Sequence, residues 1–447
     1  MKKVLVAGTG KSGIGAASLL IKTGQPVILY DGNVNVDQAA VVAKLPEGGE
    51  VSFCLGELTS EVLTETSYCV ISPGISCEAP FVQVLKAAGV PIWSEIELAY
   101  RNAKGRLAAI TGTNGKTTTT ALVGAIFAAA YPESYIVGNI GIPYADEALK
   151  MTDEAVTVAE VSSFQLETIQ QFAPQVSAIL NITPDHLDRH KTMACYMAVK
   201  ESITKNQTAE DTCVLNYEDE ELRRFGEEVH TKVWYFSSKQ ELEEGLFLRD
   251  GEIIVREEGN EYALCRTDEL KIVGQHNYEN AMAAAGVALR MGVPVDVVRR
   301  AMIAFTAVEH RIEYVTEKNG VIYYNDSKGT NPDAAIKGIE AMSRPTVLIG
   351  GGYDKGSDYT EWLTACKGRI KKLILLGQTA QAIAKTAKEI GITQIAFADS
   401  MEDAVHQAKA AAKPGDAVLL SPACASWGMF VNYEERGRIF KDLVRAD

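Results

Sequence analysis

The sequence predicts an α/β protein of three domains with mostly parallel sheets. Short apolar runs alternate with helical stretches along the whole chain, a pattern typical of parallel βαβ units. The chain has 447 residues, which allows two to four domains at about 100–200 residues each. The alternation falls into three blocks, which we expect at residues 1–95, 96–305 and 306–447.

The expected elements follow from these runs. In the first block, strands are expected at 4–7, 27–30 and 69–71, with helices at 15–23 and 94–104. The second block opens with a strand at 106–111 and an Ala-rich helix that ends near Ala130. The remaining expected strands are 155–160, 176–181, 346–349, 373–376, 394–398 and 417–420.

Composition limits the classes of function. The net charge is 44 − 58 = −14, which argues against non-specific nucleic-acid binding, because that needs an excess of Lys and Arg. The apolar run after Lys2-Lys3 is too short for a signal peptide, and we find no stretch long enough to cross a bilayer. The eight cysteines contain no C-x-x-C pair. We therefore expect a cytoplasmic protein with reduced thiols.

Gly8-Thr9-Gly10-Lys11-Ser12-Gly13 follows a predicted strand and opens a helix, and Asp31 ends the next strand. This is the dinucleotide fingerprint in its usual context, and it predicts a Rossmann-like domain that binds a diphosphate-bearing ligand. A nicotinamide cofactor is one candidate. The alternative is a glycine turn for close helix–strand packing, with Asp31 as a capping residue.

Gly112-Thr113-Asn114-Gly115-Lys116-Thr117-Thr118 lies between a strand and a helix, the arrangement of a phosphate-binding P-loop. Backbone N–H groups and Lys116 would hold phosphates, and Thr117 would ligate Mg²⁺. The general pattern has Gly where Ile110 stands, so this is a distinct subclass or a chance turn. Glu160 ends an apolar strand and is a candidate carboxylate for the metal; a helix-capping role is the alternative.

Lys200 shares a helical face with the apolar residues Met193, Met197 and Ile203. A buried lysine is costly, so from the residues alone snorkelling to the surface is the favoured interpretation. His186 follows another strand; a metal ligand is conceivable, but a lone loop histidine is usually just exposed.

Four further segments carry polar groups next to strands or helices. Residues 274–280 start an Ala-rich helix, where amides serve equally well as helix caps or as partners of an adenine or phosphate. Residues 326–332 gather an Asp, a Lys and hydroxyls after a strand, which favours a ligand site over a plain turn. Residues 350–355 and 420–426 place Lys355 and Ser421 at strand ends, where an anion would dock. No His lies near Cys424 in sequence to activate it as a nucleophile.

These motifs, in this order, resemble those of the Mur ligases, ATP-dependent enzymes that form amide bonds in peptidoglycan precursors. The resemblance spans the whole chain and rests on residues 112–118, Glu160, 181–186, His276-Asn277 with Asn280, His310-Arg311 and 326–328. Residues 72–75, 138–141, 420–426 and 430–437 are most similar to the branch that adds D-glutamate to UDP-N-acetylmuramoyl-L-alanine.

The resemblance implies a Rossmann-like first domain that binds UDP, a P-loop ATPase-like central domain, and a Rossmann-like third domain that binds the amino acid. It implies ATP, two Mg²⁺ sites and a lysine carbamate formed from CO₂. Lys116, Lys200, His186 and Glu160 would be catalytic. The metal ligands would be Thr117 and Glu160 at one site, and His186 and carbamylated Lys200 at the other.

The remaining implied contacts concern the three substrates. ATP would be held by Gly112, Thr113, Asn114, Gly115, Lys116, Thr117, Thr118, Asn277, Arg311 and Asp326. The nucleotide sugar would be held by Gly8, Gly10, Lys11, Ser12, Gly13, Asp31, Ser72, Gly74 and Asn139. D-Glutamate would be held by Lys328, Thr330, Lys355, Ser421 and Phe430, although Tyr353-Asp354 is an unexpected pair before Lys355. We expect a monomer with no nucleic-acid or membrane partner.

Three other functions compete with this interpretation. A nicotinamide-dependent oxidoreductase would use the first glycine loop but leave residues 112–118 without a role. A folate-type glutamate ligase would share the P-loop but would not need the first domain. A regulator that only binds a UDP-sugar would not need Lys116, Lys200 and His186 together.

Overall fold

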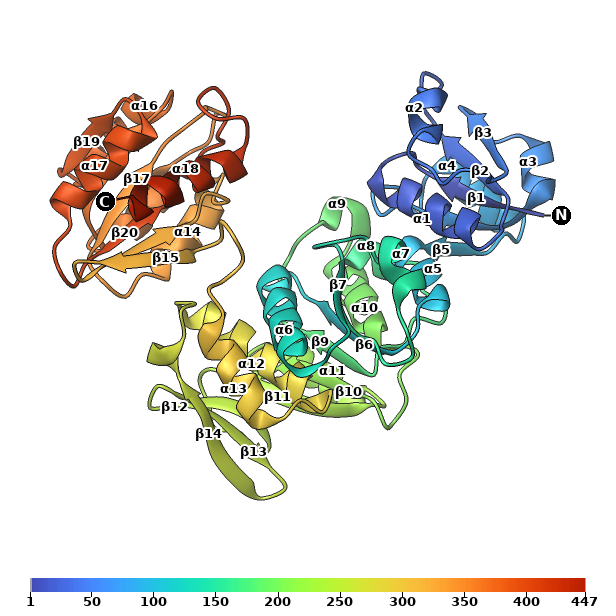
Figure 1. The fold of residues 1–447 in the computed structure, drawn as a ribbon, viewed down its shortest axis with the longest axis horizontal. Helices are drawn as coiled ribbons and strands as arrows, with labels where there is room; N and C mark the ends of the chain where they lie inside the picture. Colours follow the sequence, from blue (N-terminus) through green and yellow to red (C-terminus); the bar gives the residue numbers. More distant parts are fainter. Residues whose placement is uncertain (1, 447) are drawn as a thin grey trace. The chain divides into compact units, whose positions relative to one another are not determined.

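The computed structural model describes residues 2–446, which form three mixed or parallel sheets flanked by helices (Figure 1). The predicted fold class, α/β with mostly parallel sheets in three domains, is confirmed. The long hairpins at the edges of the second and third sheets are antiparallel and were not predicted.

The first sheet is fully parallel, in the order β3-β2-β1-β4-β5. Its strands are β1 Lys3–Ala7, β2 Val27–Asp31, β3 Val51–Leu55, β4 Thr66–Ile71 and β5 Ile92–Ser94. Its helices are α1 Lys11–Lys22, α2 Gln38–Val42, α3 Ser60–Glu65, α4 Pro80–Ala87 and α5 Glu95–Asn102. Residues 4–7 are completely buried, as expected of a central parallel strand covered by helices on both faces.

The second sheet has the order β14-β13-β12-β11-β10-β9-β6-β8-β7, with the strands from β7 to β12 parallel. Its strands are β6 Arg106–Thr111, β7 Ser134–Gly138, β8 Val156–Glu160, β9 Val176–Ile179, β10 Thr212–Asn216, β11 Lys232–Ser237, β12 Gly245–Arg249, β13 Glu252–Glu257 and β14 Asn260–Arg266. Its helices are α6 Lys116–Ala130, α7 Tyr144–Glu147, α8 Ser163–Leu166, α9 Leu187–His190, α10 Met193–Glu201, α11 Glu220–Glu228, α12 Gln275–Arg290 and α13 Val295–Ala304.

The third sheet has the order β15-β16-β20-β17-β18-β19, and only β15 is antiparallel to its neighbour. Its strands are β15 Glu313–Lys318, β16 Val321–Asn325, β17 Thr346–Gly350, β18 Ile370–Leu376, β19 Ile395–Ala398 and β20 Ala417–Leu420. Its helices are α14 Pro332–Glu340, α15 Thr360–Cys366, α16 Ala380–Ile390, α17 Met401–Ala411 and α18 Tyr433–Arg445.

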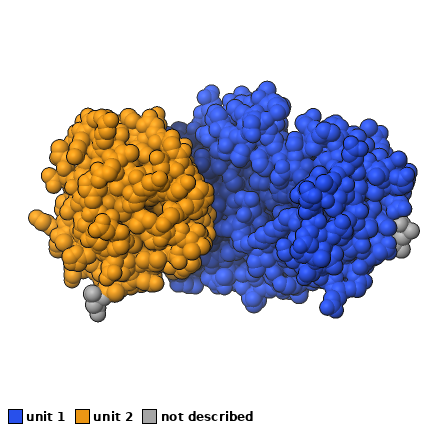
Figure 2. Space-filling view, turned by 90° about the horizontal axis from the view of Figure 1, so that it is seen from above, with its two compact units in different colours: residues 1–265, 279–302 blue, residues 266–278, 303–447 orange. Residues whose placement is uncertain are grey.

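The chain divides into two compact units, coloured separately in Figure 2. The first comprises residues 1–265 and 279–302, and the second residues 266–278 and 303–447. The first unit holds two sheets because one apolar core continues from α1 and the first sheet to α7 and the second sheet. The boundaries at 95/96 and 305/306 stay predictions.

A buried carboxylate joins the connecting helix α5 to the second sheet. Glu97 is completely buried and accepts hydrogen bonds from the backbone N–H groups of residues 170, 171 and 172, each at 2.9 Å. Arg101 donates from Nε to the same carboxylate at 2.6 Å. The predicted helix at 94–104 thus forms, with Ser94 as its cap, and it also anchors a loop 73 to 75 residues further along.

We predict that Glu97→Ala lowers the free energy of unfolding of the first unit by about 3–5 kcal/mol, because it leaves Arg101 and three backbone donors unpaired. Urea unfolding measures the change. Glu50→Ala is the control, since Glu50 is largely exposed and should change stability by no more than about 0.5 kcal/mol. Equal effects of the two substitutions would contradict the anchoring role.

Candidate functional site

The carboxyl ends of four neighbouring parallel strands gather most of the predicted catalytic segments of the central domain. In the order β9-β6-β8-β7, each strand is followed by one of them. Residues 181–186 follow β9, the P-loop 112–118 follows β6, Glu160 ends β8, and Asn139 follows β7. Parallel α/β sheets bind ligands at this edge.

The P-loop needs glycine where the sequence has it. Gly112 and Gly115 have φ values of +146° and +85°, which side chains rarely tolerate. A Cβ at Gly115 would also lie 2.2 Å from the Asn280 Oδ1. Ile110, which replaces the usual glycine, is a completely buried residue of β6, so the loop simply begins later. Helix α6 starts at Lys116 and points its N-terminus at the loop, as phosphate binding requires.

Two lysine amines meet at one carbonyl oxygen. The Lys116 Nζ donates to the Gly112 oxygen at 2.7 Å, and the Lys200 Nζ donates to the same oxygen at 2.8 Å. Lys200 is 1% exposed, so the prediction that it snorkels is wrong: its helix packs directly beneath the P-loop, and the amine has no route to solvent. Burial and the nearby Lys116 lower the pKa of Lys200 to about 7. A large fraction of the Lys200 amine is therefore neutral near physiological pH.

Glu160 offers a buried carboxylate at the same edge. Its Oε1 accepts a hydrogen bond from the Asn139 Nδ2 at 2.8 Å, while its buried Oε2 has no hydrogen-bond partner among the described residues. An orphaned carboxylate oxygen is the kind of ligand a divalent cation satisfies. Among the described residues, however, no three His, Cys, Asp or Glu side chains cluster as a ready metal site.

His186 lies at the start of α9 with a φ of +51° and is half exposed. Its Nε2 is 3.5 Å from the Asp185 carboxylate, and its ring lies 4.8 Å from that of Phe164. The exposed loop histidine expected from the residues alone is thus present, and its role as a metal ligand stays a prediction.

The first glycine loop is packed as the fingerprint predicts. A Cβ at Gly13 would lie 1.9 Å from the Gly8 carbonyl oxygen, so α1 can approach β1 this closely only with glycine there. Asp31 accepts from the Thr9 hydroxyl at 2.7 Å and from the Thr9 N–H at 3.3 Å. Burial alone would raise the pKa of Asp31, but these bonds outweigh it and lower the pKa. Ser72 also joins the loop, through its hydroxyl to the Ala7 oxygen at 2.9 Å.

A small cavity connects the first glycine loop with the central domain. It has a volume of about 140 Å³ and is lined by Lys11, Ser12 and Asn139, three of the residues predicted to bind the nucleotide sugar. Glu95 and Gln165 also line it and were missed. Gln165 donates to the Glu95 Oε1 at 2.8 Å, and burial raises the pKa of Glu95 to about 7. No sequence signal marks Glu95, because an acidic residue is common in the first turn of a helix such as α5.

The third sheet gathers the predicted amino-acid-binding residues in the same way. Strands β16, β20 and β17 are adjacent, and their carboxyl ends lead into residues 326–332, 421–426 and 351–355. Ser421 donates its hydroxyl to the Asp326 carboxylate at 2.7 Å. Lys328 lies with its Nζ 5.3 Å above the Tyr433 ring, and the Lys355 Nζ lies 4.5 Å above the Trp427 ring. Phe430 packs partly buried against the core of this unit.

Arg436 was not predicted, although it organises two of these loops. It is 1% exposed, donates to the Ser327 backbone oxygen at 2.8 Å and donates to the Cys424 oxygen at 3.0 Å. Burial raises the pKa of Cys424, so this thiol is not an activated nucleophile, in agreement with the sequence analysis.

The three residues predicted to complete the ATP site, Asn277, Arg311 and Asp326, belong to the second unit, whereas the P-loop belongs to the first. The Asn277 side chain donates to the Val273 oxygen at 2.8 Å, and Arg311 is exposed. Asn280, by contrast, lies in the first unit and accepts from the Thr119 hydroxyl at 3.3 Å, beside the P-loop.

None of the eight cysteines forms a disulfide. Within residues 2–446, no helix combines the length and apolar character needed to span a membrane.

Fold and site together define a P-loop protein with an additional Rossmann-like domain, and comparison with known proteins identifies the family. Residues 2–94 match the MurD-like N-terminal domain of Mur ligases, residues 110–288 the Mur ligase middle domain, and residues 310–424 the Mur ligase glutamate ligase domain. The chain belongs to the Mur ligase family.

Two curated relatives resemble the chain along its full length. A UDP-N-acetylmuramoylalanine--D-glutamate ligase of Lachnoclostridium phytofermentans is 53% identical over 445 residues, covering 100% of this chain and 98% of the relative. The ligase of the same name from Lachnospira eligens is 54% identical over 444 residues, covering 99% and 98%. Among solved structures, MurF from Acinetobacter baumannii shares the fold, with a TM-score of 0.60, 16% identity and coverage of 99% of this chain and 93% of that one.

The buried carboxyl of Asp326 should make the stability of the folded chain depend on pH. Burial raises the pKa of this carboxyl to about 7, although Ser421 and the Ile312 N–H donate to it. In the unfolded chain the pKa of this carboxyl is about 4. Between these values the folded chain binds more protons than the unfolded chain, so this group lowers stability as the pH rises from about 4 to about 7.

We therefore predict that Asp326→Asn, which cannot titrate, gains stability relative to wild type as the pH rises through this window. Urea unfolding of both chains at several pH values measures the difference. A difference that does not change with pH would contradict the raised pKa.

Proposed function

We propose that this chain is the ATP-dependent ligase that joins D-glutamate to UDP-N-acetylmuramoyl-L-alanine, in the synthesis of peptidoglycan precursors. The observation that carries the proposal is the meeting of the P-loop, Lys200, Glu160 and Asn139 at one sheet edge. A phosphate-binding loop beside a lysine and a carboxylate is what an acyl-phosphate ligase needs. Both full-length relatives described above carry the name of this activity.

In this proposal the P-loop holds the ATP phosphates. The backbone N–H groups at the start of α6 and the Lys116 amine would surround the phosphate position, and the α6 N-terminus adds its dipole. The N–H groups of Thr113 and Asn114 instead donate to Asn181. We also propose that Asn277, Arg311 and Asp326 bind ATP. The reaction is an attack by the terminal carboxylate of the nucleotide sugar on the ATP γ-phosphorus, which releases ADP and forms an acyl phosphate.

D-Glutamate then attacks the acyl carbon with its amine, and inorganic phosphate leaves as the amide forms. Lys328, Thr330, Lys355 and Phe430 receive the amino acid, with the two lysines facing its carboxylates. Ser421 is completely buried and donates to Asp326, so we expect it to act by fixing that carboxyl. Exclusion of water matters here, because water would hydrolyse the acyl phosphate.

The cation-binding groups are consistent with Mg²⁺. The orphaned Glu160 oxygen, the Thr117 hydroxyl at the start of α6 and the half-exposed His186 are oxygen and nitrogen donors on one edge. Bound Mg²⁺ supplies charge compensation for the phosphate oxygens. Lys200 would join this set as a carbamate, because its buried and partly neutral amine is a nucleophile for CO₂ and the product is an anion.

The nucleotide sugar would occupy the first domain. Glycines in the first loop would let its backbone approach a diphosphate, and Lys11 and Ser12 line a cavity together with Asn139. Asp31 ends β2, and Ser72 and Gly74 follow β4; these two strands lie on either side of β1. We place the reaction in the cytoplasm, which free thiols suit.

The direct test is release of phosphate from ATP in the presence of UDP-N-acetylmuramoyl-L-alanine and single amino acids. We predict release that depends on both the nucleotide sugar and D-glutamate, and little release with L-glutamate. Release that is independent of D-glutamate would overturn the proposal.

Lys200 gives a second test. We predict that Lys200→Ala loses about 100-fold or more in kcat, because it removes an anion from the site, and that bicarbonate or a short carboxylic acid partly restores the rate. Steady-state kinetics measure both effects. The control is Lys205→Ala, an exposed residue just beyond α10, which should leave the rate unchanged. Full activity of the Lys200 variant would refute its role.

A further inference from the structure

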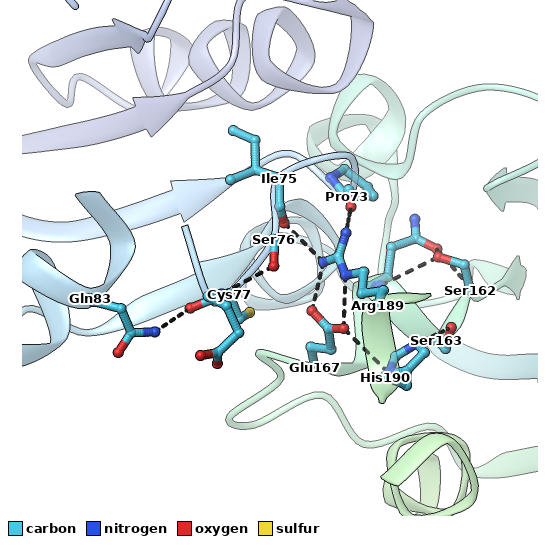
Figure 3. Close-up of polar contacts among 12 residues, drawn as sticks. Pro73, Ile75, Ser76, Cys77, Gln83, Ser162, Ser163, Glu167, Arg189 and His190 are labelled. Carbon is cyan, nitrogen blue, oxygen red and sulfur yellow. Dashed lines mark hydrogen bonds and ion pairs between the residues drawn. The ribbon is translucent and has the colours of Figure 1, made fainter. Parts of the chain in front are cut away.

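Arg189 uses its whole guanidinium group to join two parts of the first unit (Figure 3). Its Nε and Nη2 form two bonds with the Glu167 carboxylate, at 3.0 and 2.6 Å. Its Nη1 donates to the Pro73 oxygen at 2.6 Å, and its Nη2 donates to the Ile75 oxygen at 2.9 Å. Arg189 and Glu167 come from the central domain, while residues 73–75 belong to the first domain.

The geometry requires arginine. Four bonds use the fixed fork of the guanidinium group, and the ring of Phe164 packs 4.1 Å from its central carbon. A lysine carries one ammonium and cannot bond the carboxylate twice while also reaching two carbonyl oxygens. Only 12% of each side chain of the Arg189–Glu167 pair is exposed, so salt screens it little.

The two ends of this contact lie next to predicted substrate residues. On the first-domain side, the bonded carbonyls flank Gly74 and follow Ser72, whose hydroxyl is tied to the strand that carries the first glycine loop. On the central side, Arg189 lies in α9, the short helix that His186 caps. Arg189 therefore links residues 73–75, which are expected to lie at the nucleotide sugar, to α9, which follows the predicted catalytic residue His186.

Contacts within the first domain also hold the 73–77 loop: the Cys77 oxygen accepts from Gln83 and Lys86, and Ile75 packs against the apolar core of the first sheet. Beside the arginine lies a cavity of about 600 Å³ whose walls come from both domains, including Ser76 and Lys86 on one side and Thr168 and Gln170 on the other. The four bonds of Arg189 join residues 73–75 of the first domain to Glu167 of the central domain beside this cavity.

We propose that Arg189 is a positioning residue for the nucleotide sugar: by fixing residues 73–75 against α9, it sets the distance between the diphosphate loop and the reacting carboxylate. The inference rests on the proposed function. It assigns Arg189 no contact with the substrate itself. Its loss should weaken nucleotide-sugar binding and leave ATP and D-glutamate binding unchanged.

Arg101 provides a matched control. It also pairs with a buried glutamate, Glu97, and also packs against an aromatic ring, with its central carbon 4.1 Å from Trp93. It lies in the same unit but touches neither residues 72–75 nor α9. A loss of stability alone should therefore appear in both variants, and a loss of positioning only in the Arg189 variants.

The experiment measures kcat and the KM of each of the three substrates for wild type, Arg189→Ala, Arg189→Lys and Arg101→Ala. Calorimetric titration with UDP-N-acetylmuramoyl-L-alanine alone accompanies the kinetics. We expect Arg189→Ala to raise the KM and the Kd of the nucleotide sugar about tenfold or more, since small displacements of a bound substrate are costly. Arg189→Lys should give a rise in the same direction, whereas the KM values of ATP and D-glutamate stay within about twofold.

Three results would overturn the inference: an unchanged nucleotide-sugar KM in both Arg189 variants, an equal rise in all three KM values, or the same rise in Arg101→Ala. If Arg189→Ala does not fold, Arg189→Lys decides by the same criteria. The proposed function fails separately, if the wild-type chain binds the nucleotide sugar but releases no phosphate with D-glutamate. A wild-type chain that does not bind the nucleotide sugar overturns both.

Discussion

The shared carbonyl oxygen of Gly112 is the constraint on which the rest of the site depends. Two lysine amines donate to it, at 2.7 and 2.8 Å, and one of them is almost completely buried. Two ammonium charges this close are stable only if an anion lies beside them or if one amine gives up its proton. The P-loop supplies the place for such an anion, and the lowered pKa of Lys200 meets the second condition. The strand ends that deliver Glu160 and Asn139 bring a buried carboxylate to the same edge.

This local arrangement of charge explains how a chain of acidic composition could bind anionic substrates. A chain with a net charge of −14 is proposed to bind three anionic substrates, and long-range attraction cannot help it. Positive groups instead gather at strand ends: Lys116 and Lys200 meet at the second sheet, and Lys328 and Lys355 follow strands of the third. The amines of Lys328 and Lys355 each lie over an aromatic ring, Tyr433 and Trp427.

Sequence reasoning found the elements whose ends are marked by glycine or by a change of periodicity. Strand β6 and the end of α6 at Ala130 agree with the prediction, because a glycine loop separates them and buried apolar residues define the strand. The antiparallel β12–β13 pair was missed, although each strand has a short apolar run, 246–248 in β12 and 253–255 in β13. The site residues were found where a motif names them. Their environment was not predictable: whether Lys200 snorkels depends on what packs above its helix, and that is a loop 88 residues away.

The residues that sequence reasoning missed share one property. Glu95, Glu97, Arg189 and Arg436 act through partners distant in the chain, as when Arg189 reaches the Pro73 oxygen 116 residues away. Locally, Glu95 and Glu97 look like first-turn acids, and Arg436 looks like a polar residue of an amphipathic helix. Hydrogen bonding of a charged side chain to partners distant in the chain is a tertiary property, and only the fold reveals it.

The central claim is that the Lys200 amine, held beneath the P-loop, takes up CO₂. The most direct measurement is NMR of the chain labelled with ¹⁵N-lysine in ¹³C-bicarbonate, where a carbamate shows a carbon signal coupled to one lysine nitrogen. The account predicts one such signal in wild type and its loss in Lys200→Ala. No coupled signal in wild type, or a signal that survives in Lys200→Ala, would contradict it.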